Sequence, residues 1–246
     1  MAADGLPATS SYFMEPTFIH RIPPAEQAAY KASEVATLLG VPKTTIGAWC
    51  FGQDRGAGRS FKPLVAPADT AGRLLSFTNL CELHVLAVIR RHHLINMAAV
   101  RSSLDYVRTQ LQEDRPLVAQ EFMTNGIDLF IEKASQLINV SRDGQTALRG
   151  EFQQALARID RNAQGGPVRL FPYSRISPDI AHQPKAVAID PRISFGRPIL
   201  LNAGVMTAVI SDRFMAGDSV AEMAQDYDVA EAEIDEALRF TQRLAA

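Results

Sequence analysis

Cysteine is scarce in this sequence, which has two among its 246 residues, Cys50 and Cys81. Two cysteines cannot build a disulfide framework, and such scarcity is typical of a protein from a reducing compartment. The sequence also lacks an apolar run long enough to cross a bilayer. Its first residues do not join a basic stretch to an apolar one, so we expect no signal peptide. Together these absences predict a cytoplasmic protein.

Positive charge is not in excess either. The 25 lysines and arginines face 27 acidic residues, a net charge of −2, so any surface for nucleic acid must be local. The length predicts roughly one or two domains with a sizeable core. No phosphate-cradling glycine loop, nucleophile elbow or paired catalytic carboxylates are found in the sequence. We therefore expect a binding protein with no catalytic residues and no cofactor.

The stretch from Ala32 to Trp49 predicts two helices joined by a tight turn. Ser33 is expected to cap the first helix, Gly40 accepts a positive φ at low cost in the turn, and Pro42 suits the start of the second helix. Such a pair is typical of a DNA-reading helix-turn-helix, with a purely structural helical hairpin as the alternative. The residues predicted to enter the major groove are Lys43, Thr44 and Thr45.

The glycine-rich stretch FGQDRGAGRSFKPLVAP follows, and it predicts a wing of two short strands around a loop. From Tyr30 to Arg73 six basic residues face three acidic ones, a local charge of +3 in an acidic chain. Basic side chains on a helix and an adjacent loop suit phosphate contacts, although an ordinary solvated loop is the alternative. The residues predicted to hold phosphates are Arg55, Arg59 and Lys62.

Two long helices are expected next, capped by Ser76 and Asn96. The first is apolar on several sides, so we expect it to be buried or shared between subunits. Helix-turn-helix proteins commonly pair over a two-fold site, and residues 77–89 and 97–111 are the predicted homodimer interface. Cys81 and His84 lie one helical turn apart, but side chains on an apolar helix are more often packed than metal-bound. We predict no metal site.

Residues 116–172 are expected to form a small α+β segment. Asn125-Gly126 predicts a hairpin turn, residues 138–140 a strand, residues 145–161 a helix and residues 168–171 a further strand.

The last part follows a proline-containing linker at residues 173–187. Residues 188–201 should be extended, and Thr207, Ser219 and Ala230 open three helices of a homeodomain-like bundle. From Asp218 onward eight acidic residues face two arginines, so phosphates would be repelled. This bundle, residues 188–246, is therefore expected to bind protein and not DNA.

A resemblance to a known family rests on several stretches. They are YKASEVATLLGVPKTTIGAW, LSFTNLCELHVLAVIRRH, GIDLFIE, INVSRDGQ, IDPRISFGRPIL, DRFMAGDSVAEMAQDY and IDEALRF. The chain resembles VapB-like antitoxins, which join a MerR-like N-terminus to a C-terminal domain of unknown function. Gly47 departs from the MerR-like pattern, which often has a basic residue there. The resemblance covers nearly the whole chain from Tyr30 onward and implies a mainly α fold with small β elements, with a MerR-like winged helix-turn-helix at residues 30–115 and the C-terminal bundle. Residues 1–29 are rich in Ala, Pro and Ser, a composition that predicts a mobile N-terminal arm.

For function, the resemblance implies an antitoxin that binds operator DNA, represses its own operon and neutralises a PIN-like, Mg²⁺-dependent ribonuclease toxin. The basic strip from Pro167 to Pro198 is expected to hold the toxin, because arginine forks pair with the carboxylates of a metal site and aromatic residues anchor interfaces. Pairing of these arginines with Asp190 is the alternative, and a MerR-like regulator that senses a small molecule or metal is the rival function. The toxin-binding candidates are Phe171, Tyr173, Arg192, Phe195 and Arg197.

Overall fold

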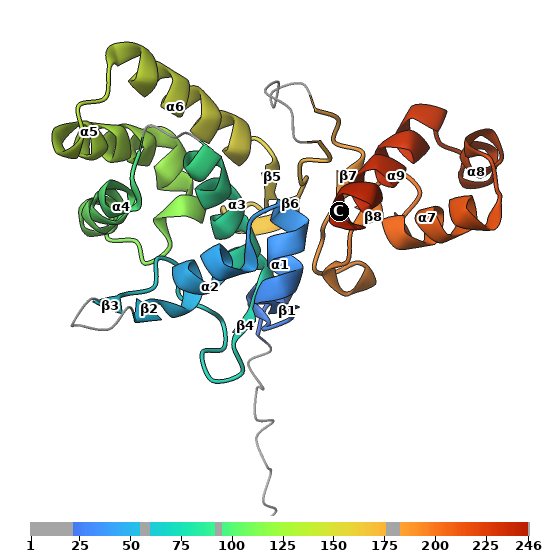
Figure 1. Cartoon of the computed structure of the whole chain (residues 1–246), viewed down its shortest axis with the longest axis horizontal. Helices are drawn as coiled ribbons and strands as arrows, with labels where there is room; N and C mark the ends of the chain where they lie inside the picture. The colour runs from blue at the N-terminus through green and yellow to red at the C-terminus, as the bar shows by residue number, and fades with distance from the viewer. Residues whose placement is uncertain (1–21, 55–59, 92–94, 176–182, 246) are drawn as a thin grey trace, which may run out of the picture.

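The structure is a computed structural model that describes residues 22–54, 60–91, 95–175 and 183–245. Within these ranges the fold is mainly helical with small antiparallel sheets, as the sequence predicted (Figure 1). No helix in the described ranges has the length and apolar character that a bilayer span needs. The helices are α1 (Ala32–Leu39), α2 (Lys43–Phe51), α3 (Phe77–Arg91), α4 (Met97–Leu111), α5 (Ile127–Leu137), α6 (Arg142–Leu156), α7 (Thr207–Ala216), α8 (Val220–Tyr227) and α9 (Glu231–Ala245).

The strands are short and all pair antiparallel. Those that pair are β1 (Tyr30–Lys31) with β4 (Leu74–Leu75), β2 (Gln53–Asp54) with β3 (Ser60–Phe61), β5 (Ile159–Arg161) with β6 (Pro167–Leu170), and β8 (Ile199–Leu200) with both β7 (Val187–Ala188) and β9 (Val205–Met206).

Helices α1 and α2 form the expected pair around a tight turn. Gly40 adopts the left-handed conformation (φ 63°, ψ 38°) and its N–H closes α1 on carbonyl groups of that helix. The predicted Ser33 cap is wrong, because Lys31 is the N-cap and α1 begins at Ala32, two residues earlier than a Ser33 cap requires. The Glu34 carboxylate accepts a hydrogen bond from the Lys31 N–H (2.9 Å) and satisfies the first turn instead.

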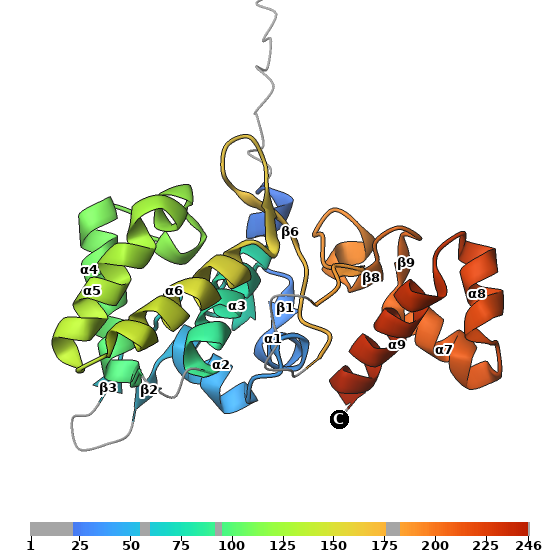
Figure 2. The same ribbon diagram turned by 90° about the horizontal axis from the view of Figure 1, so that it is seen from above.

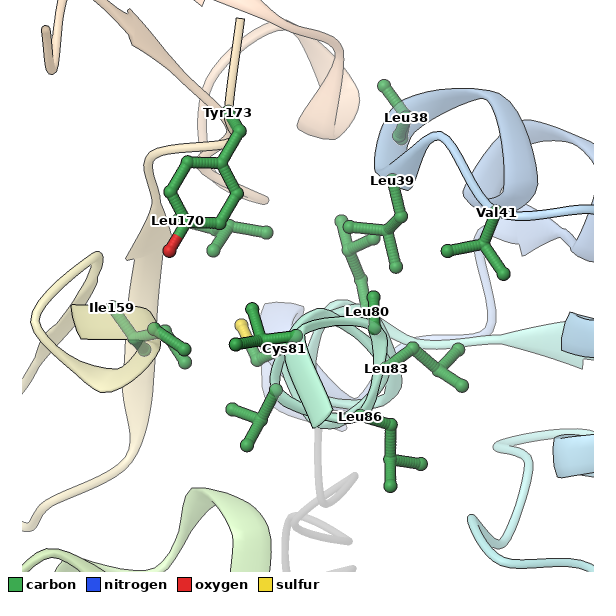
Figure 3. Close-up of a cluster of buried hydrophobic side chains, with 14 of the residues drawn as sticks. Leu38, Leu39, Val41, Leu80, Cys81, Leu83, Leu86, Ile159, Leu170 and Tyr173 are labelled. Carbon is green, nitrogen blue, oxygen red and sulfur yellow. The ribbon is translucent and has the colours of Figure 1, made fainter. Parts of the chain in front are cut away.

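Helix α3 is the centre of the core. Its side chains are buried from Phe77 to Ile89, and Figure 3 shows Leu80, Cys81, Leu83 and Leu86 pointing outward from it in different directions. Leu39 of α1 and Leu170 of β6 lie on facing sides of the same cluster. The hypothesis that α3 serves as a subunit interface is therefore wrong, because its own chain covers it.

The predicted helix caps of this core are confirmed. Ser76 Oγ accepts a hydrogen bond from the Asn79 N–H (3.1 Å), and the Asn79 side chain accepts one in return from the Ser76 N–H (3.0 Å). Asn96 Oδ1 accepts from the Ala99 N–H (2.9 Å) at the start of α4. These side chains satisfy donors that a helix N-terminus leaves without partners.

The hairpin predicted at Asn125-Gly126 is wrong, because these residues lie in a helical stretch that runs into α5. Gly126 has helical angles (φ −68°, ψ −32°). A Cβ atom there would come within 2.5 Å of the Phe122 ring and 3.2 Å of Leu111. The glycine is thus used for close helix packing against α4 and not for a turn.

Two neighbouring boundaries also differ from the prediction. Residues 138–140 connect two helices and form no strand. Helix α6 begins at Arg142, because Ser141 Oγ caps it by accepting a hydrogen bond from the Gly144 N–H (3.2 Å). It ends at Leu156, before β5, so it is shorter at its C-terminal end than predicted. The strand predicted at residues 168–171 is present as β6, shifted by one residue.

Part of the segment predicted as a mobile N-terminal arm is docked on α3. Thr78 Oγ1 donates hydrogen bonds to the Ala25 carbonyl (3.1 Å) and to the Glu26 carboxylate (2.6 Å). Arg115 also pairs with Glu26 at 2.7 Å. Residues 1–21 lie outside the described residues, so the prediction for them stays a prediction.

In the C-terminal part, α7, α8 and α9 pack together beside the β7–β8–β9 sheet (Figures 1 and 2). The predicted Ser219 cap is confirmed, with Glu222 completing a capping box. The predicted Thr207 cap is wrong: Met206 is the N-cap of α7, and the Thr207 N–H donates to the Pro198 carbonyl (3.0 Å).

A carboxyl group lies inside the core next to this framework. Glu82 of α3 is 2% exposed, and it accepts one hydrogen bond from Asn79 Nδ2 (3.0 Å). Burial raises its pKa to about 7, and the Asn79 hydrogen bond with the charges of Arg115 and Arg108 offsets this only in part. Glu82 is thus protonated in the folded protein at pH values where the unfolded chain would ionise it.

This difference predicts a pH-dependent stability. Between the ordinary value of 4.5 and about 7 the folded state holds a proton that the unfolded state has lost, so the free energy of unfolding falls as pH rises. At about 1.4 kcal/mol per pKa unit, the loss is on the order of 3 kcal/mol by pH 8. Glu82→Gln removes this titration. The free energy of unfolding of the variant, minus that of the wild type, should therefore be larger at pH 8 than at pH 5, as measured by urea unfolding.

Glu132→Gln, on the surface of α5, is the control and should show no such change with pH. If the difference between Glu82→Gln and the wild type is the same at both pH values, the assignment to Glu82 is wrong.

Candidate functional site

The first candidate surface surrounds α2 and is called here the α2 face. Lys43 and Thr44 are exposed at the start of α2, and Thr45 is half-buried. Beside them lies a cavity of about 500 Å³ between α2, the β2–β3 pair and the facing ends of α3 and α4. The residues that define the α2 face are Thr44, Thr45, Gln53, Phe61, Arg90 and Arg101.

Two arginines of this face were missed by the sequence analysis. Arg90 donates a hydrogen bond from Nη1 to Thr45 Oγ1, and Arg101 donates one to the Lys62 carbonyl. The Arg101 guanidinium also lies 5.6 Å from the centre of the Phe61 ring. Neither residue lies in the predicted helix pair at residues 32–49 or in the wing that follows it, and only the packing of α3 and α4 brings them to this face.

The predicted wing residues are only partly placed. The two strands expected around the loop are present as β2 and β3, with Gln53 opposite Phe61. The Lys62 side chain is exposed beside β3. Arg55 and Arg59 lie outside the described residues, so their predicted role stays a prediction.

The second candidate surface is the loop between β7 and β8, which the buried Asp190 organises. Arg192 binds both carboxylate oxygens of Asp190 (2.9 and 2.7 Å), and Arg169 lies 3.5 Å from the same group. Burial raises the pKa of Asp190, but the Arg192 hydrogen bonds and the two positive charges outweigh this and hold it below its ordinary value. The pairing of Arg192 with Asp190, left open as an alternative, is thus present.

Three successive left-handed residues form the tip of this loop. Ser194 and Phe195 have φ values of 49° and 54°, which non-glycine residues rarely adopt. Gly196 follows at φ 72°, and a Cβ atom there would clash with the Tyr30 hydroxyl at 2.0 Å. The turn holds the Phe195 side chain 95% exposed, with Arg192 and Arg197 exposed on either side. We call residues 192–197 the Phe195 turn.

The Phe195 turn is attached to β1 and α1. The Tyr30 hydroxyl donates to the Gly196 carbonyl (3.1 Å), and Arg197 lies 3.3 Å from the Glu34 carboxylate. Arg243 of α9 donates to the Leu38 carbonyl (2.9 Å) at the end of α1. These contacts surround a second, largely apolar cavity of about 500 Å³ between α1, α7 and α9.

Two of the five predicted toxin-binding residues are inside the protein. Phe171 and Tyr173 are buried, so the expectation that they anchor a partner on the surface is wrong. Tyr173 packs on the guanidinium of Arg158 at 4.7 Å. Arg158 is itself buried and donates hydrogen bonds to four carbonyls, those of Phe171, Pro172, Gln183 and Pro184. Arg158, just before β5, therefore holds together the residues that precede the predicted linker and the last part of the linker, and Tyr173 packs on this arginine.

The count of acidic residues in the C-terminal bundle also needs correction. Glu236 was expected among its repelling surface charges, but it is buried on α9. Its carboxylate accepts hydrogen bonds from Ser174 Oγ and from Arg175 Nη2, the latter at 2.7 Å. This ion pair contributes to joining α9 to the linker.

The Cys81 and His84 pair lies in the packed core. Cys81 is fully buried, and burial raises the pKa of its thiol above the ordinary value. The His84 ring stacks on Tyr173 with 5.2 Å between ring centres. Within the described ranges, no group of three or more His, Cys, Asp or Glu side chains is placed to hold a metal ion.

Comparison with known proteins gives both curated relatives and a solved structure. Residues 187–241 match the family model described as a protein of unknown function, DUF433. The chain is 26% identical over 233 residues to the Mycobacterium tuberculosis protein named "Putative antitoxin VapB45", covering 85% of this chain and 92% of that protein. It is 22% identical over 230 residues to the uncharacterized protein Rv2308 of the same organism, covering 89% and 92%.

The solved structure is the X-ray crystal structure of Rv2018 from M. tuberculosis. It matches with a TM-score of 0.62 at 20% identity, covering 87% of this chain and 98% of that one. At this identity the match shows a shared fold. The sequence matches support an antitoxin-like family, and they extend over nearly the whole length of the relatives.

The Phe195 turn generates a prediction about stability. An exposed phenylalanine at a left-handed position adds strain without burial, whereas asparagine tolerates that conformation. Phe195→Asn should therefore keep the wild-type free energy of unfolding or raise it by up to about 1 kcal/mol. Thermal and urea unfolding measure the change, with Phe171→Asn as the buried comparison that should destabilise. A loss of more than about 1 kcal/mol for Phe195→Asn would show that the side chain supports the fold.

Proposed function

We propose that this protein is the antitoxin of a toxin–antitoxin pair, that it binds the operator of its own operon and that it neutralises a PIN-like ribonuclease. The observation that carries this proposal is the similarity to an antitoxin-named protein across 85% of this chain and 92% of that protein. The structure adds two exposed surfaces with different chemistry, the α2 face and the Phe195 turn. Each suits one of the two partners that such a protein must bind.

The α2 face suits DNA. In the proposed MerR-like winged helix-turn-helix, α2 enters the major groove and its first residues reach the base edges. Lys43 and Thr44 are exposed there, and Thr45 is held by Arg90. In a homodimer, two such faces would read the two halves of a palindromic operator. The dimer contact would have to use a surface other than α3.

Replacing Lys43, Thr44 and Thr45 together by alanine should remove sequence discrimination. Removing one base contact costs about 1–3 kcal/mol for the correct site, whereas binding to random DNA changes little. Fluorescence anisotropy with the region upstream of the gene and with a random duplex measures the ratio of the two affinities. Lys133→Ala on α5 is the control, and an unchanged ratio in the triple variant would exclude α2 as the reading helix.

The Phe195 turn suits an acidic protein surface. A PIN-like ribonuclease presents carboxylates that bind Mg²⁺, and an arginine fork can pair with such a group in two places at once. Arg197 is 64% exposed and its pairing with Glu34 is at the surface, so it can exchange partners at low cost. Phe195 lies between the two arginines and supplies apolar contact area.

Arg192→Ala with Arg197→Ala should abolish toxin inhibition and leave DNA binding intact. The toxin is obtained as the small protein that co-purifies with this chain, and its ribonuclease activity is measured with increasing antitoxin. Arg239 is exposed on α9 and lies within 4 Å of acidic residues of its own helix, so Arg239→Ala is the control and should inhibit like the wild type. Full inhibition by the double variant would reject the arginine contact even if the two proteins still associate.

A further inference from the structure

We propose that Arg90 and Arg101 hold DNA backbone phosphates, so that α3 and α4 supply the positive charge that α2 itself lacks. The inference deepens the proposed function, because it rests on α2 as the DNA-reading helix. The partner is a phosphodiester backbone in duplex DNA. The position of both arginines at the edge of the cavity beside α2 is the observation that leads to it.

The outer side of α2 carries little positive charge. Lys43 is the only basic residue among KTTIGAWCF, and it stands at the first position. At Gly47 an added Cβ atom would find nothing within 4 Å, so this part of the helix is open to close approach. A helix with this composition can come near DNA but can hold few phosphates, and such contacts supply most non-specific affinity.

The two arginines bring charge to this same surface. Arg90 reaches α2 from the end of α3 and contacts Thr45, and Arg101 reaches β3 from α4. Among the described side chains, those that line the cavity between them include two threonines and Gln53 and no carboxylate. Arginine with a hydroxyl or amide neighbour is a common combination at phosphate contacts.

The environment of Arg101 favours an anion. Burial lowers the pKa of its guanidinium from the ordinary value, a sign that the charge is partly desolvated, and the neighbouring Arg108 charge acts in the same direction. Asp105 acts against both, but it pairs with Arg108 at 2.9 Å. A phosphate oxygen near Arg101 would compensate this partly desolvated charge.

Arg90 also has a second effect in this arrangement. Its bond to the Thr45 hydroxyl fixes a side chain at one of the predicted base-reading positions. A single arginine that contacts both a phosphate and Thr45 would set the register of α2 in the groove. Phosphate contacts fix register and orientation on a duplex, whereas base contacts choose the sequence.

The experiment measures binding to a random 30-base-pair duplex by fluorescence anisotropy as the salt concentration is raised. The double variant Arg90→Gln with Arg101→Gln should bind more weakly, and its plot of log affinity against log salt should be less steep by about two units, close to one for each phosphate that is no longer held. Arg90→Lys with Arg101→Lys keeps the charge and should recover most of the slope. Arg149→Gln, an exposed arginine on α6, is the control and should change neither quantity.

The outcomes separate this inference from the proposed function. If the wild-type protein binds no duplex DNA, the DNA-binding part of the proposed function fails and this inference fails with it. If the wild type binds and the glutamine variant, folded by circular dichroism, keeps the full slope, the inference alone is wrong. If the lysine variant shows the same loss as the glutamine variant, the arginines act by holding Thr45 and the Lys62 backbone in place and not by binding phosphate, which also overturns the inference.

Discussion

The burial of α3 on every side is the constraint on which the rest of the structure depends. A largely apolar helix that is buried around its whole circumference does not lie on the surface, so other elements must enclose it. Helix α1 covers one side, and α6 with β6 lies along others. The resulting core is continuous from Tyr30 to Phe240, so both candidate surfaces are supported by the same packed interior.

Polar side chains inside this interior connect segments that are distant in sequence. Asn79 accepts from the Ala68 and Ser76 N–H groups and donates to the Ala66 carbonyl and to Glu82. Arg158 satisfies four carbonyls at the ends of the linker. Buried polar groups cost free energy unless they are paired, so each such residue stabilises one arrangement of loops and disfavours others that would leave it without partners.

The features best predicted from the sequence are those that depend only on neighbouring residues, such as helix caps. Ser76, Asn96 and Ser219 cap the helices expected of them, because an N-cap hydrogen bond needs only residues within one turn. Asn125-Gly126 was misread as a hairpin, since the close approach of Phe122 and Leu111 to Gly126 is a tertiary contact. The helical spacing of the apolar residues predicts the helix that is present there better than the turn motif does; these residues are Ile127, Phe130, Ile131 and Ala134.

The same difference between local and tertiary contacts explains which residues of the candidate sites could be predicted. Lys43 and Thr44 could be predicted because a helix-turn-helix has a local pattern, but Arg90 and Arg101 could not, because only the folding of α3 and α4 against α2 brings them together. Phe171 and Tyr173 were misplaced for a related reason. An aromatic residue near basic ones in sequence is typical both of an interface and of a buried contact between a ring and a cation. In the folded chain the buried Arg158 packs on Tyr173, so the second arrangement is the one present.

Helix α1 separates the two proposed interfaces. Its end holds the C-terminal part through Arg243, and its outer side does so through the Glu34–Arg197 contact, beside the Tyr30–Gly196 contact from β1. Helix α2 follows after the Gly40 turn and carries the other surface. The cavities beside the two surfaces share none of their lining residues. A partner on the Phe195 turn and DNA on the α2 face therefore do not compete for the same side chains. The two surfaces are connected through α1, which packs on α3, and through β6, which also packs on α3 and holds Asp190 by Arg169.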